Sequence, residues 1–186
     1  MWFRSILAGF LIGFAALLSL CIENKIIAAF MFSIALLYIR ISSLYLFTGQ
    51  VQNLRNKTTN LKELFCGILG NMIGVGWALL LLPFLAMGKE ILFTSYEAVL
   101  LTKWSYPWYY YVVSGLCCGI LMTIATKKET PLWLSSMCVA AFILAGFNHC
   151  VADWFYVGGT LGNYLKWFCI MIGNFIGGLI VATNKI

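Results

Sequence analysis

The chain has 186 residues, of which 62% are hydrophobic and only 10% are charged, and its mean hydropathy is +0.94. A soluble domain carries about 25% charged residues, and a chain of this length has no interior large enough to hide so much apolar surface. We therefore expect one all-α integral membrane domain over residues 1–186. The net charge of +6 includes no basic cluster longer than Lys127-Lys128, which argues against a nucleic-acid partner and favours loop charge beside membrane lipid.

Six apolar stretches are long enough to cross a membrane. A bilayer core about 30 Å thick needs about 20 apolar residues in a helix. The expected spans are residues 5–22, 26–48, 63–87, 107–126, 131–156 and 164–184. Segment 89–106 is expected to be a longer, aromatic-rich connection at the membrane surface.

The basic residues predict the orientation. If the N-terminus is cytoplasmic, the inner loops and ends hold Arg4, Arg55, Lys57, Lys62, Lys127, Lys128 and Lys185, and the outer ones hold Lys25, Lys89, Lys103 and Lys166. Because cytoplasmic loops are enriched in Lys and Arg, seven against four favours two cytoplasmic termini. We expect a multi-pass protein of the cell membrane, most simply a bacterial inner membrane.

A short motif occurs twice. Gly70-Asn71-Met72-Ile73-Gly74 in the third expected span recurs 103 residues later as Gly173-Asn174-Phe175-Ile176-Gly177 in the sixth. Three spans separate the copies, and an odd number reverses the orientation, which indicates an inverted 3+3 repeat with halves of about 1–87 and 103–186. The alternative is two ordinary contacts between helices through small residues.

The second and fifth expected spans each contain a polar or glycine-bearing interruption. These interruptions are Leu46-Phe47-Thr48-Gly49 and Gly146-Phe147-Asn148-His149. Corresponding breaks in two halves are typical of a transport site, and a broken helix directs backbone amides at a ligand in the gap, which suits an anion.

Three ionisable residues lie inside expected spans. His149 is the single histidine, and Asp153, the single aspartate, lies four residues later on the same helical face. Such groups are costly in a membrane and mark functional sites, although His149 satisfied by hydrogen bonds between helices is an alternative, and Asp153 either orients that ring, lies near water or faces the pore. Arg40 has three open readings: it pairs with Asp153, reaches the membrane surface or attracts anions.

Nothing in the sequence indicates an enzyme, a metal or a cofactor. The nucleophile elbow, the zinc motif HExxH, the phosphate loop and the dinucleotide fingerprint are all missing from the sequence. The seven cysteines include no CxxC pair and lie mostly in apolar runs, so we interpret them as small buried hydrophobic residues.

Together these segments resemble the formate/nitrite transporter family over nearly the whole chain. The resemblance rests on Leu46 to Gly49, on the block from Lys62 to Gly74, on Gly146 to Asp153 and on Ile172 to Gly178. It implies an aquaporin-like six-helix protomer with broken second and fifth spans, assembled as a homopentamer with one pore per protomer. It also implies passage of small weak-acid anions such as formate, nitrite, hydrosulfide or lactate.

The resemblance assigns roles to individual residues. Phe32 and Phe142 would line the outer constriction, and Leu36, Leu46 and Phe47 the inner one. Thr48 would hold the substrate near His149, and Lys103 would lie in the outer vestibule. Asn148, Asp153 and Arg40 depart from the family pattern, where Glu, Asn and an apolar residue are usual.

A bare anion does not cross an apolar constriction, but a weak acid crosses in its neutral form. Lys103 would gather the anion by its local field, and His149, with an unperturbed pKa of about 6.5, would exchange the proton. The alternatives are an ammonium or small neutral-solute channel on the same fold, for which Asp153 adds negative charge, and a membrane assembly protein that transports nothing.

Overall fold

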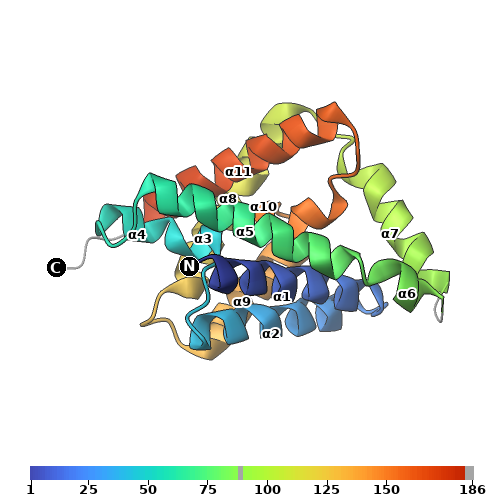
Figure 1. Cartoon of the computed structure of the whole chain (residues 1–186), viewed down its shortest axis with the longest axis horizontal. Coiled ribbons are helices and arrows are strands. Elements are labelled where there is room, and N and C mark those ends of the chain that lie inside the picture. The colour runs from blue at the N-terminus through green and yellow to red at the C-terminus, as the bar shows by residue number, and fades with distance from the viewer. Residues whose placement is uncertain (88–89, 183–186) are drawn as a thin grey trace.

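The structure is a computed structural model that describes residues 1–87 and 90–182, and over those residues the secondary structure is entirely helical. The helices are α1 (Trp2–Leu20), α2 (Lys25–Ile41), α3 (Phe47–Gln50), α4 (Gln52–Arg55), α5 (Leu61–Leu79), α6 (Leu82–Ala86), α7 (Glu90–Lys103), α8 (Trp108–Thr126), α9 (Leu132–Leu144), α10 (Cys150–Asp153), the 3-10 turn η1 (Trp154–Tyr156) and α11 (Leu161–Val181). In Figure 1, α1, α2 and α5 lie side by side, and α6 and α7 stand at the end of the molecule opposite to α4. The all-α prediction is confirmed.

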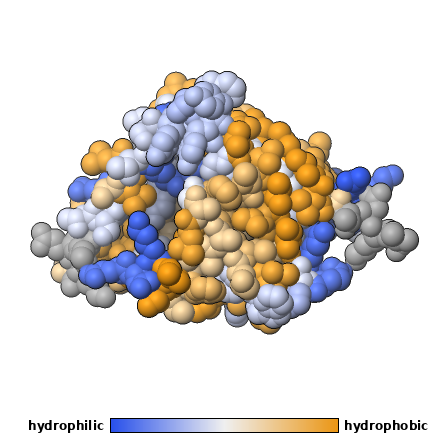
Figure 2. Space-filling model, turned by 180° about the vertical axis from the view of Figure 1, so that it is seen from behind, coloured by the Kyte–Doolittle hydropathy of each residue, from blue (hydrophilic) through white to orange (hydrophobic). Residues whose placement is uncertain are grey.

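Four helical segments of the described chain are long and apolar enough to cross a membrane: α1, Leu61–Ala86 (α5 with α6), α8 and α11. The apolar helix α9 is shorter, with 13 residues. Large hydrophobic side chains such as Phe65, Phe84 and Leu165 are exposed on the outside of these helices. Figure 2 shows a broad hydrophobic surface with hydrophilic residues gathered near the two ends of the long axis. Lipid, and not water, suits such a surface.

The second and fifth expected spans are both interrupted, close to the predicted positions. Helix α2 ends at Ile41 and α3 begins at Phe47, whereas α9 ends at Leu144 and α10 begins at Cys150. Both endings use one turn. Leu44 N donates to Ile39 O at 2.8 Å, and Phe147 N donates to Phe142 O at 2.9 Å.

A residue with positive φ allows each of these turns. It is Ser43 in the first (φ 51°) and Gly146 in the second (φ 72°), and the two positions are 103 residues apart. A left-handed residue with this hydrogen bond to a carbonyl five positions earlier terminates a helix. Both interruptions therefore follow from local backbone geometry.

Segment 89–106, which we expected to be a connection, contains a helix that we did not predict: Glu90–Lys103 forms α7. Leu92 is fully buried, and the Tyr96 ring contacts the rings of Phe155 and Tyr156 at 5.7 and 5.8 Å between centroids. These contacts bind one face of α7 to η1, a partner that the local sequence does not reveal. Lys89 and Lys185, which we counted for the orientation, lie outside the described residues.

Glycines allow two helix pairs to approach closely. A Cβ atom on Gly9 of α1 would lie 2.0 Å from Asn71 O of α5, and a Cβ atom on Gly119 of α8 would lie 2.3 Å from Asn174 O of α11. No side chain fits at either crossing. The motif found twice in the sequence therefore forms the contact surface of α1 with α5 and of α8 with α11.

Candidate functional site

The two interrupted segments meet at a hydrogen bond between side chains. Thr48 Oγ1, in α3, lies 3.0 Å from His149 Nε2, and both residues are buried. His149 is the N-cap of α10, so the break in the fifth expected span is what turns its ring toward α3. The structure thus brings together two residues 101 positions apart that the sequence analysis singled out.

The hydrogen bonds of the His149 ring fix its tautomer. Ala152 N donates to Nδ1 at 3.1 Å, so Nδ1 must carry a lone pair. A neutral ring then holds its proton on Nε2, which donates to Thr48 Oγ1. Protonation at Nδ1 would break the cap of α10 and set two donors against each other. The site is therefore built for a neutral imidazole with one N–H group directed at Thr48.

Two buried asparagines hold the interrupted segments in place. Asn71 Oδ1 accepts from Phe47 N at 2.9 Å, and its Nδ2 donates to Tyr45 O and Ser5 O. Backbone groups freed by a break must find partners within the protein at membrane depth. Asn71 supplies these partners for the segment that carries Thr48.

Asn174 repeats this arrangement in the second half. Its Oδ1 accepts from Cys150 N at 2.8 Å, and its Nδ2 donates to Asn148 O and Gly115 O. The sequence shows both asparagines as parts of a repeated motif, which does not reveal this role. The 103-residue spacing was the available signal for this role. Asn71 and Asn174 are 103 residues apart, and so are the residues whose carbonyls they bind, Tyr45 and Asn148.

One phenylalanine side chain stacks on the His149 ring, and a second one packs against the first. The Phe142 and His149 rings lie 5.7 Å apart with an interplanar angle of 22°, and Phe32 meets Phe142 edge to face at 6.3 Å. Leu36 and Leu46 are also buried, with 1% and 2% of their surface exposed. All five expected constriction residues are therefore buried in the core, and Phe142 is the one that stacks on His149.

Phe47 also lines an apolar groove between helices. The groove has a volume of about 210 Å³, and its other lining residues belong to α5 and α11, namely Leu61, Leu64, Phe65, Ile68, Met171, Ile172 and Phe175. Its backbone N–H is held by Asn71, as described above. The structure therefore associates Phe47 with this groove, while its neighbour Leu46 lines a separate polar pocket.

Lys103 is paired with an acid. Its Nζ lies 2.7 Å from Asp153 Oδ1 and donates to Asn148 Oδ1 at 3.2 Å. Only 19% of the Lys103 side chain and 7% of the Asp153 side chain are exposed. Asn148 is held further by Ser114 Oγ, which accepts from both its backbone and its side-chain nitrogen and which the sequence analysis did not identify. Lys103, Asn148 and Asp153 thus form one cluster beside His149.

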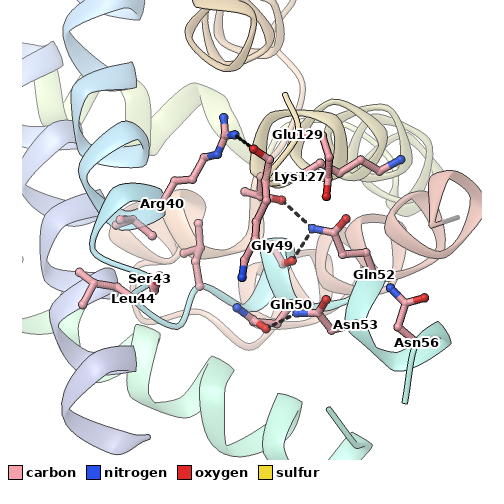
Figure 3. Close-up of a pocket in the computed structure, with 14 residues that line it drawn as sticks. Arg40, Ser43, Leu44, Gly49, Gln50, Gln52, Asn53, Asn56, Lys127 and Glu129 are labelled. Carbon is pink, nitrogen blue, oxygen red and sulfur yellow. Dashed lines mark hydrogen bonds between the residues drawn. The ribbon is translucent and has the colours of Figure 1, made fainter. Parts of the chain in front are cut away.

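Arg40 does not pair with Asp153. Its guanidinium donates to Ser135 Oγ at 2.5 Å and to Lys128 O at 2.7 Å. It lines a polar pocket of about 460 Å³ with Leu46 and Gly49, shown in Figure 3. The described residues include no group of three or more side chains suited to hold a metal ion.

Comparison with known proteins gives three matches. The family model described as formate/nitrite transporter matches residues 1–184. A solved structure named FNT family ion channel is similar with a TM-score of 0.80 and 22% identity, covering 96% of this chain and 85% of that one. A pentameric formate channel with formate bound is similar with a TM-score of 0.76 and 19% identity, covering 96% and 92%. A sequence comparison with curated proteins gives no significant match.

Proposed function

The chain belongs to the formate/nitrite transporter family, as its sequence suggested, and we propose that it is a channel for small monovalent weak-acid anions, with formate as the first candidate. The observation that carries this proposal is the hydrogen bond between Thr48 and His149, which joins two interrupted segments next to the Phe142 ring that stacks on His149. The family and the similar solved structures are transporters and channels and not enzymes, and the apolar helices make the chain a multi-pass membrane protein.

We propose six spans arranged as an inverted repeat over one domain, residues 1–186. The matched bonds of Asn71 and Asn174 and the matched turns at Ser43 and Gly146 support it. A further contact supports a two-fold relation: Ser33 Oγ and Ser136 Oγ, themselves 103 residues apart, lie 2.6 Å from each other. Equivalent residues touch only at the axis that relates them.

In the proposed mechanism, the substrate crosses the apolar region as its neutral acid. The neutral His149 ring offers Nε2–H to a substrate oxygen but no positive charge to balance an anion. The proton must therefore reach the anion before it passes the ring, and crossing is coupled to protons because only the protonated form is admitted. Thr48, the present partner of Nε2, is the group that the substrate replaces.

The paired lysine modifies the expected role of the outer vestibule. Asp153 cancels most of the Lys103 charge at longer distances, so the pair attracts anions as a local dipole and not as a free cation. The same pairing weakens the ammonium alternative, because the Asp153 carboxylate already has a cation. Of the two readings, the anion channel agrees better with these contacts.

We propose a homopentamer in a cell membrane, with both termini in the cytoplasm. One of the similar structures is a pentameric formate channel, and the exposed apolar side chains of the outer helices suit neighbouring protomers and lipid. Tyr45 N donates to Arg4 O, and Arg55 donates to Ala182 O, so the beginning of α1 and the end of α11 both lie near the α2–α4 region. Both termini are therefore on one side in this proposal.

A flux screen in proteoliposomes tests the function. We expect uptake of formate, and of nitrite or hydrosulfide, above the rate of empty liposomes, and faster uptake at pH 5.5 than at pH 7.5. Lactate serves as a larger acid and ammonium as the opposite charge. Uptake of ammonium without uptake of any of the acids would reject the anion channel.

A further inference from the structure

A polar pocket next to Leu46 lies apart from the cluster of Thr48, His149 and Lys103. Its volume is about 460 Å³, and its walls come from the end of α2, from α3 and α4, and from the turn between α8 and α9. Figure 3 shows Arg40 on one side of it and the amides of Gln50, Gln52 and Asn53 on the other. Because Leu46 and Gly49 flank Thr48 in the chain and line the same pocket, the pocket lies at one mouth of the proposed pathway.

Arg40 brings a cation without an acidic partner to this pocket. Its two hydrogen bonds go to Ser135 Oγ and to Lys128 O, both uncharged acceptors. The one salt bridge among the described residues joins Lys103 and Asp153. A guanidinium has five N–H donors in a planar fork that matches a carboxylate, so donors remain after these two bonds.

The remaining polar groups favour an anion in the same space. Lys127, Lys128 and one acidic residue, Glu129, also line the pocket. Lys128 and Glu129 are both exposed, and the Lys127 ammonium donates to Val181 O at 3.2 Å. Asn53 donates to Gln50 Oε1 at 2.6 Å, so the amide oxygen of Gln50 is engaged and its NH2 group faces the open part of the pocket. Arg40 and Lys128 therefore oppose the single acid Glu129 at this pocket, since the Lys127 ammonium donates to Val181 O, whereas Lys103 is paired with Asp153.

We propose that Arg40, with the Gln50 amide, binds the small carboxylate substrate at the mouth beside Leu46, before it enters or after it leaves the apolar region. This inference rests on the proposed function for the identity of the ligand. The two ends of the pathway then differ in local anion concentration. Arg40 raises this concentration at its end, and Lys103, which is paired with Asp153, raises it much less at the other end. Half-saturation then occurs at a lower formate concentration on the Arg40 side.

Chemical protection tests the site without any transport. The purified protein is treated with phenylglyoxal, which modifies arginine, in sodium formate or in sodium gluconate at the same ionic strength, and modification of each arginine is measured by mass spectrometry. We expect formate to slow the modification of Arg40 at least threefold and to leave Arg55 unchanged, since Arg55 binds Ala182 O and does not line the pocket. Equal modification of Arg40 in both salts would overturn the proposal.

Flux measurements test its role. Arg40→Gln should raise the formate concentration for half-maximal flux about fivefold from the Arg40 side, as expected for loss of one charge near a hydrated site, and leave the opposite side unchanged. Lys62→Gln removes one exposed charge near the start of α5, away from the pocket, and should change neither value. The inference would be overturned if Arg40→Gln and the wild type had the same formate concentration for half-maximal flux from both sides.

Two further results separate this inference from other causes. Arg40→Lys keeps the positive charge but not the planar guanidinium. If Arg40 binds formate, the formate concentration for half-maximal flux in Arg40→Lys should lie between those of the wild type and Arg40→Gln. If Arg40 is purely structural, both variants should lose folded protein. If formate protects Arg40 but does not cross the membrane, the proposed function fails and the site stands. If formate crosses but neither protects Arg40 nor depends on it, the site fails and the function stands.

Discussion

At the scale of single residues, His149 connects the local backbone to the proposed transport. Its two ring nitrogens do different things: Nδ1 caps α10 and Nε2 donates to Thr48. The sequence predicted that this histidine matters, because it is the single one and lies in an interrupted span. It did not predict the tautomer, which depends on the Ala152 N–H that the break exposes.

His149→Asn should separate these two roles. Asparagine is a good N-cap, so α10 keeps its start, but the shorter side chain does not reach Thr48. We expect a folded protein whose pH-dependent formate uptake falls at least tenfold in proteoliposomes. Wild-type uptake at both acidic and neutral pH would contradict the role of Nε2, and His149→Ala, which loses both functions, serves as the comparison.

The ion pair gives a second prediction at this scale. Lys103→Gln leaves the Asp153 carboxylate buried without a cation, which should cost about 3 kcal/mol of stability. Asp153→Asn should cost less, because the Lys103 side chain is partly exposed, and it should increase anion uptake by freeing the positive charge. Thermal unfolding in detergent and flux measure the two effects.

The matched control is the double variant Lys103→Gln with Asp153→Asn. It carries no uncompensated charge and should regain most of the stability lost in Lys103→Gln. Simple addition of the two single effects would mean that the pair does not interact as the 2.7 Å distance indicates.

At the scale of elements, two asparagines define how the interrupted segments are held. The sequence predicted interruptions at 46–49 and 146–149, because Gly and polar residues break apolar runs; the helices end at Ile41 and Leu144 and resume at Phe47 and Cys150. It did not predict helix α7, whose contacts with Phe155 and Tyr156 are tertiary. Nor did it predict that Phe47 borders a groove with α5 and α11, since the face of a residue in so short a helix has no periodic signal.

Asn174→Ala should be strongly destabilising. It leaves Cys150 N and Asn148 O without the Asn174 partner, at about 1–3 kcal/mol for each unsatisfied group, and removes a second bond to Gly115 O, which lies within helix α8. Thermal unfolding in detergent should show a large loss. Asn163→Ala, in the first turn of the same helix and with one bond to Val157 O, is the control and should lose about 1 kcal/mol. Similar losses in both variants would contradict the role of Asn174.

Gly119→Ala tests the close helix crossing. The new Cβ atom would lie 2.3 Å from a backbone oxygen of α11, so α8 and α11 must separate and stability must fall. Gly76→Ala in α5 has nothing within 4 Å of the new atom and should be neutral or slightly stabilising. A Gly119→Ala protein as stable as Gly76→Ala would contradict the packing described for these helices.

At the scale of the whole molecule, hydrophobicity alone predicted a membrane protein, and four segments of the described chain are long and apolar enough to span. The two interrupted spans consist of shorter helices, which a criterion of continuous helix length does not detect, although the apolar stretches 26–48 and 131–156 predicted them. Charge is where the sequence was least informative: it left three readings of Arg40 open, and it did not predict that Lys103 is the residue that pairs with Asp153. Linear sequence does not reveal which residues of α2, α7 and α10 meet.

The most direct test of the central claim measures formate, protons and current together. In proteoliposomes given a formate gradient, the account predicts one proton entering with each formate, seen as matched acidification of an internal pH dye, and no membrane current in a planar bilayer. Empty liposomes correct for formic acid that crosses lipid by itself. A formate current without internal acidification would contradict passage as the neutral acid.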